Sequence, residues 1–209
     1  SPVFRFRGSA HSPPGLSLRV EPRLDNDDQI GDFAAKWWCS ELVKGRDRMT
    51  PVNQETLQAL TSGIQAEVAS YVFYREALKK QQVTQIRTIL EELALEEKRH
   101  FHVLERQYDS LVRSEKWIST ADLMKQEGLP EVPEEMSRTH TALMGEVAQA
   151  ASLREILAIA LRLEEQARDI YARALTFVQS EEGRKVFERL VSFEEGHVRK
   201  VKGMMEKYL

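Results

Sequence analysis

The feature that most constrains this chain is a pattern of glutamate and histidine residues that occurs twice. Glu67 is followed 30 residues later by a Glu-x-x-His motif, and Glu164 is followed at the same distance by a second one. An offset of 97 residues superimposes the two copies. Together they contain six candidate metal ligands: Glu67, Glu97, His100, Glu164, Glu194 and His197. In four-helix bundles, two helical hairpins that each supply a Glu and a Glu-x-x-His form a two-metal carboxylate site.

Four long segments carry the 3-4 spacing of apolar residues that is typical of amphipathic helices. We expect helices over about 51–80, 82–113, 152–179 and 180–209. Three of their starts have sequence signals, which are Thr50-Pro51, the capping box Ser152–Glu155 and Ser180. The apolar stripes contain all six candidate ligands near mid-helix, and the second stripe begins at Val83. The candidate ligands should therefore point into the core.

These helices form two hairpins, at 51–114 and 152–209, joined by a long crossover at 115–151 with a helix over Glu134–Gln149. This connectivity predicts an all-α four-helix bundle of two helical hairpins with one long crossover. Residues 1–50 are rich in proline and glycine and are expected to form an N-terminal extension. A short helix in this extension, starting at Asp27 or Asp28, would contain Phe33, Trp37, Trp38 and Leu42.

The chemistry of the candidate site follows from the cost of burying carboxylates. Four converging carboxylates would place about four negative charges in one apolar volume, where repulsion forces some to take up protons unless cations are present. The i, i+3 spacing puts His100 beside Glu97 and His197 beside Glu194. Oxygen-rich ligation with one imidazole per half favours two iron ions, manganese or a mixed pair over zinc. The alternative is a duplicated motif that no longer binds metal.

Other polar and aromatic residues on these helices admit simpler explanations. Tyr71, Tyr74 and Tyr171 lie in the apolar stripes, where they are either plain core aromatics or hydrogen-bond donors to ligand carboxylates. His102 lies roughly 200° around the helix from His100 and is expected to face solvent.

Composition excludes several partner classes. A formal net charge of −3 gives no reason to expect nucleic acid or an anionic membrane surface as partner. No apolar run approaches the roughly 18–20 residues of a membrane span. No signal peptide is visible at Ser1, although the missing Met leaves a removed leader open. Cys39 is the single cysteine, so an internal disulfide is excluded and a reducing, cytoplasmic setting is expected.

The repeat resembles the ferritin-like di-iron superfamily and, within it, the rubrerythrin-like branch. Four motifs carry the resemblance over about residues 51–209: Glu67-x-x-Ser70-x-x-x-Tyr74, Glu97-x-x-His100, Glu164-x-x-Ala167-x-x-x-Tyr171 and Glu194-x-x-His197. The resemblance implies a ferritin-like bundle in which the six residues hold two irons. It implies Glu97 and Glu194 as bridging ligands, with the outer carboxylates as terminal ones.

Two departures separate this chain from well-known members. A rubredoxin-type iron centre needs four cysteines, and this chain has one. Leu161 occupies the position one turn before the third-helix glutamate where the peroxidase members resemble one another in having an extra carboxylate. Electrons must therefore come from an external donor, and Leu161 argues against efficient peroxide chemistry.

The resemblance implies a non-haem di-iron oxidoreductase that reduces peroxide or O2, in a chain that pairs as a homodimer. The alternatives are a ferroxidase that stores or buffers iron, a substrate hydroxylase with an organic pocket beside the metals, and a helical interaction module with a vestigial site. Iron and manganese, the oxidant and the donor are not distinguished by the sequence.

Overall fold

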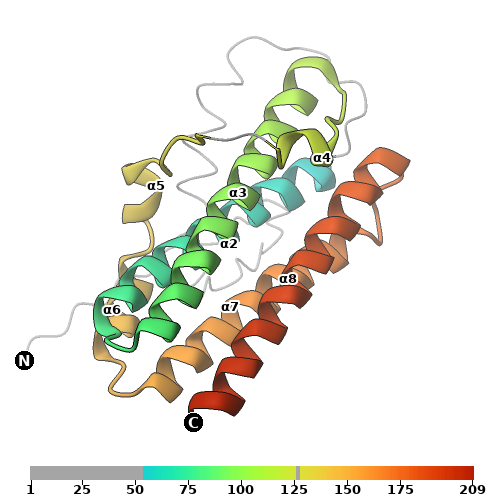
Figure 1. The fold of residues 1–209 in the computed structure, drawn as a ribbon. Coiled ribbons are helices and arrows are strands. Elements are labelled where there is room, and N and C mark those ends of the chain that lie inside the picture. The colour runs from blue at the N-terminus through green and yellow to red at the C-terminus, as the bar shows by residue number, and fades with distance from the viewer. Residues whose placement is uncertain (1–53, 126–127) are drawn as a thin grey trace, which may run out of the picture.

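The computed structural model describes residues 54–125 and 128–209 of the chain (Figure 1). Within these ranges the regular structure is helical and no strand is present. The helices are α2 (Gln54–Lys80), α3 (Thr84–Ser114), α4 (Thr120–Leu123), α5 (Glu134–Arg138), α6 (Thr141–Gln149), α7 (Leu153–Ala174) and α8 (Glu181–Tyr208). The predicted extension 1–50, its short helix and the Thr50-Pro51 helix start lie outside the described residues.

The two predicted hairpins are present. Helix α2 packs against α3, α7 packs against α8, and contacts between α2 and α7 join the two pairs, while α5 and α6 lie against α2 (Figure 1). One hydrophobic core runs through all four long helices, with fully buried Leu60, Leu93, Leu157 and Leu190 at the faces that meet. The predicted all-α bundle of two hairpins with one crossover is confirmed.

Helix ends follow local capping chemistry. The Ser152 hydroxyl accepts a hydrogen bond from the Glu155 backbone N–H, and the Glu155 carboxylate accepts one from the Ala151 N–H. Ser180 caps α8 in the same manner, by accepting from the Gly183 N–H. These bonds satisfy backbone donors that a helix start leaves without partners.

Two predictions about helix ends were wrong. Helix α7 ends at Ala174 rather than near residue 179, because the following residues tighten into short turns such as the bond from the Phe177 N–H to the Ala174 carbonyl. The apolar pattern predicts that Val83 lies in the inward stripe of α3, but Val83 is exposed. Since α3 begins one residue later, Val83 has an extended backbone and does not share the buried face of the helix.

The crossover also differs from its prediction, because the single helix expected over Glu134–Gln149 is two helices, α5 and α6. The Thr139 hydroxyl donates to the Met136 carbonyl at 2.6 Å. Such local bonds compete with helix continuation, and α5 ends there.

Side chains from the first hairpin fix the crossover in place. Lys80 Nζ donates to three carbonyls at the end of α6, at 2.6–3.0 Å. Tyr71 and Lys98 both bond the carboxylate of Glu131. His102 Nε2 lies 2.9 Å from the Pro130 carbonyl.

The expectation that His102 faces solvent was therefore wrong. The crossover covers this face of α3, and the imidazole is buried between Pro130 and Glu105.

No helix in the described ranges combines the length and the apolar character that crossing a bilayer requires.

Candidate metal centre

All six candidate ligands lie at the middle of the four long helices and point into the core. Glu67 comes from α2 and Glu164 from α7, while α3 and α8 each contribute a Glu-x-x-His pair. Each of the six residues exposes 3% or less of its surface. Their burial follows from position, because each one occupies the apolar stripe of an amphipathic helix.

Four of these residues form a compact central group. One ligand atom from each of Glu97, His100, Glu194 and His197 lies within 4.8 Å of the others. Glu97 faces both imidazoles, with its oxygens 3.5 Å from His100 Nδ1 and 2.9 Å from His197 Nδ1. Glu194 does the same, at 3.4 Å from each Nδ1. The two glutamates therefore lie between the two histidines.

The other two carboxylates flank this group from opposite sides. Glu67 Oε2 lies 3.5 Å from His100 Nδ1, and Glu164 Oε2 lies 3.2 Å from His197 Nδ1. Neither is within ion-pair distance of the other histidine. The repeat in the sequence is therefore also a repeat in space. Glu97 and Glu194 at the centre each lie near both histidines. Glu67 and Glu164 at the two ends each lie near one histidine.

Two tyrosines connect the two helical hairpins through hydrogen bonds to the outer carboxylates. Tyr74 on α2 donates a hydrogen bond to Glu164 on α7, and Tyr171 on α7 donates one to Glu67 on α2. The predicted role as donors to the candidate ligands therefore fits Tyr74 and Tyr171. It does not fit Tyr71, whose hydroxyl bonds Glu131 of the crossover at 2.8 Å and so lies on another face of α2.

Gly63 allows one of these tyrosines to reach its partner. A Cβ at this position would lie 2.7 Å from Cε1 of the Tyr171 ring and 3.1 Å from its hydroxyl oxygen. The missing side chain lets the ring lie against the backbone of α2, one turn before Glu67.

The polar atoms of the cluster fit a pair of divalent cations. Both oxygens of Glu97, both oxygens of Glu194 and Oε2 of Glu67 are buried without a hydrogen bond of good geometry among the described residues. The nearby imidazole nitrogens are within ion-pair distance but are not aligned as hydrogen-bond donors to these five oxygens. Buried carboxylate oxygens without donors are costly. Carboxylate-rich sets with one imidazole per ion suit iron or manganese.

In the metal-free cluster, burial and the neighbouring charges shift the pKa values of the carboxylates and the imidazoles. Burial, reinforced by the charges of Glu194 and Glu97, raises the pKa of Glu67 well above its usual value. Burial and the charge of Glu97 likewise raise the pKa of Glu164. Burial opposes charge on His100 as well, yet the carboxylates that surround its Nδ1 raise its pKa well above the usual value. Without cations, burial and mutual repulsion favour protons on the outer carboxylates, and the surrounding carboxylates favour a proton on the imidazole.

The sequence prediction missed one residue that contacts this cluster. Glu96 precedes a candidate ligand by one position and lies off the inward stripe of α3, but its Oε2 is 3.0 Å from His197 Nε2 on α8. The same oxygen accepts a hydrogen bond from Lys200 at 2.6 Å. The hydrogen bond with His197 lowers the pKa of Glu96 to about 2, although partial burial acts to raise this pKa. Only the packing of α3 on α8 identifies this residue.

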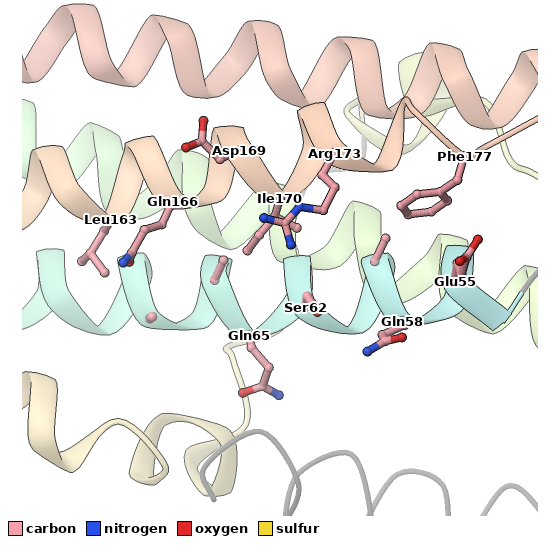
Figure 2. Close-up of a pocket in the computed structure, with 13 residues that line it drawn as sticks. Glu55, Gln58, Ser62, Gln65, Leu163, Gln166, Asp169, Ile170, Arg173 and Phe177 are labelled. Atoms are coloured by element: carbon pink, nitrogen blue, oxygen red, sulfur yellow. The ribbon is translucent and has the colours of Figure 1, made fainter. Parts of the chain in front are cut away.

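A groove of about 790 Å³ runs along α2 and α7 (Figure 2). Its walls include Ser62, Ala66, Leu163 and Ile170, and none of the six candidate ligands lines it. The groove is therefore a separate feature from the cluster.

Comparison with known protein families matches residues 58–205 to the family described as Rubrerythrin. This range extends from the second turn of α2 to the last turn of α8 and contains all six candidate ligands. The resemblance predicted from the repeat is confirmed. A search of curated proteins found no match, and a search of solved structures found none either.

Proposed function

Because this chain belongs to the rubrerythrin family, we propose that it is a non-haem di-iron oxidoreductase that reduces peroxide or O2 at the buried cluster, with electrons from an external donor. One observation carries the proposal. Glu97 and Glu194 each face both imidazoles, and none of their four oxygens has a hydrogen bond among the described residues. This arrangement supports Glu97 and Glu194 as the residues that would hold both ions of a pair.

The remaining residues take roles that follow from their contacts. Glu67 would complete the position beside His100, and Glu164 the position beside His197. Tyr74 and Tyr171 would orient these outer carboxylates, each from the opposite hairpin. The fully buried surroundings keep bulk water from the cluster. A pair of ferrous ions, when bound, supplies two electrons to one oxidant without release of a one-electron product.

The test is metal content. We would reconstitute the metal-free protein anaerobically with ferrous iron, desalt it and measure iron per chain by elemental analysis. About two irons per chain are expected for the wild type. The double variant E97Q/E194Q, which keeps side-chain volume, should lose tight binding of both. The matched control is E91A/E188A, which removes two exposed glutamates from the same helices α3 and α8.

The outcomes separate the alternatives. Retention of two irons by E97Q/E194Q would contradict the ligand assignment. A wild type that folds, as judged by circular dichroism, but binds no metal would identify a vestigial site.

A ferroxidase that stores or buffers iron is the second candidate, and Leu161 favours it. This residue lies one turn before Glu164, is partly buried against the core and offers no oxygen to a metal. We expect the ferrous protein to be oxidised at least as fast by O2 as by H2O2. Stopped-flow mixing with each oxidant measures the ratio, and faster oxidation by H2O2 would favour a peroxidase. Uptake far beyond two irons per chain would favour storage.

Homodimer formation stays a prediction.

A further inference from the structure

The repeat breaks at one position next to the cluster. The offset of 97 residues that superimposes the two copies carries Glu96 onto Phe193. Both residues contact the histidine of the opposite hairpin. Glu96 Oε2 lies 3.0 Å from His197 Nε2, whereas the Phe193 ring stacks on His100 with centroids 4.8 Å apart and planes within 9°. One copy therefore has a carboxylate where the other has an apolar ring.

This difference changes what each imidazole can do. With Nε2 donating to Glu96, His197 can present the lone pair of Nδ1 to a cation. In the metal-free structure that Nδ1 lies 3.2 Å from Glu164 Oε2 and faces the central carboxylates. A carboxylate on the second nitrogen also makes an imidazole a stronger ligand. The stacked Phe193 fixes the plane of His100 but has no carboxylate to accept a hydrogen bond, so His100 has no counterpart of the contact between Glu96 and His197.

The Glu96 carboxylate is itself held in place. Lys200, one turn after His197 on α8, donates to the same Oε2 at 2.6 Å. Position 103 is the counterpart of Lys200 in the first copy and is occupied by a buried valine. The polar arrangement Lys200–Glu96–His197 therefore exists on one side of the cluster.

We propose that Glu96 is a positioning residue for His197 and makes the two metal positions unequal, so that the position beside His197 binds its ion first and more tightly. The inference rests on the proposed function, because it requires the two-metal cluster. It goes further by assigning an order of filling and a residue that sets it.

The experiment is a titration of the metal-free protein with Co²⁺, which keeps its oxidation state in air on this timescale. Calorimetry would measure the two binding steps, and visible absorption would report the ligand environment at each step. The wild type should show two steps that differ by about tenfold or more in affinity. The variant Glu96→Ala should weaken the tighter step by about 10- to 100-fold.

The matched control is Phe193→Ala, a truncation at the equivalent position of the other copy, which should leave the tighter step unchanged. Glu96→Gln keeps an oxygen that can accept from His197 and should retain part of the affinity lost in Glu96→Ala. Thermal unfolding of each metal-free variant checks that the bundle is intact.

Two results would overturn the inference alone. One is a Glu96→Ala variant that binds two ions with wild-type affinities. The other is a tighter step that Phe193→Ala weakens as much as Glu96→Ala does. A wild-type protein that does not bind two ions would instead overturn the proposed function, so the two failures are distinguishable.

Discussion

The hydroxyl of Tyr171 on α7 donates a hydrogen bond to Oε1 of Glu67 on α2. The equivalent hydrogen bond in the other copy of the repeat runs from the hydroxyl of Tyr74 on α2 to Glu164 on α7. Each hairpin therefore holds the outer carboxylate of the other. These bonds couple the packing of α2 on α7 to the geometry of the cluster, so that a change in one should be measurable in the other.

Replacing Tyr171 by Phe removes one of the two crossed bonds and leaves a buried carboxylate without its donor. We expect a loss of about 1–3 kcal/mol in the free energy of unfolding of the metal-free protein, measured with urea, and weaker binding of one metal ion. The control is Tyr71→Phe, because that hydroxyl bonds the exposed Glu131 outside the cluster. Equal effects of the two variants on metal affinity would argue against the crossed bonds.

Replacing Gly63 by Ala should destabilise the protein, although alanine is the better helix former. The added Cβ would lie 2.7 Å from the rigid, buried Tyr171 ring. Overpacking of this kind costs about 1–3 kcal/mol. Gly203→Ala in α8 is the matched control, since a Cβ there meets nothing within 4 Å. That control should gain about 0.5–1 kcal/mol from helix propensity. Thermal unfolding compares the two, and a Gly63→Ala variant as stable as the control would contradict the close packing.

Replacing Lys80 by Met tests how the crossover is held. The ammonium group of Lys80 bonds three carbonyls at the end of α6, whereas its neighbour Lys79 pairs with Glu76 at the surface. We expect Lys80→Met to lower the free energy of unfolding by about 1–3 kcal/mol, because hydrogen bonds to charged groups are the stronger ones. Lys79→Met should change it by less than about 0.5 kcal/mol. Limited proteolysis should cut the crossover faster in the first variant. Equal rates of cleavage in the two variants would argue against this role of Lys80.

Metal binding should release protons. In the metal-free cluster, burial opposes charge on His197, but the nearby carboxylates raise its pKa above the usual value, as they do for His100. Below a raised pKa the imidazole carries a proton that a cation must displace, so the affinity should rise with pH. The expected slope is about tenfold per pH unit for each proton released. Calorimetry in two buffers of different ionisation enthalpy counts these protons, and affinity that does not vary with pH would contradict the prediction.

The class of the fold and the six candidate ligands could be predicted from the sequence, because both follow from positions along each helix. Apolar residues at 3-4 spacing define a helix and its buried face without reference to any partner, and Glu97 and His100 fall on that face by position alone. Ser152 and Ser180 mark helix starts for the same local reason, since a cap bonds backbone within its own first turn. The 97-residue offset then related two such hairpins to each other.

Contacts between residues of different helices could not be predicted from the sequence. Glu96 lies off the inward face of α3 yet contacts His197, and His102 is buried because the crossover packs over it. The 97-residue offset pairs Tyr171 with Tyr74 and leaves Tyr71 without a tyrosine counterpart. Only the packing shows that Tyr171 holds Glu67 whereas Tyr71 holds the crossover. Periodicity reports the direction of a side chain from its own helix axis. Contacts between helices depend on the rotation and offset with which two helices pack, and these are set by the whole core at once.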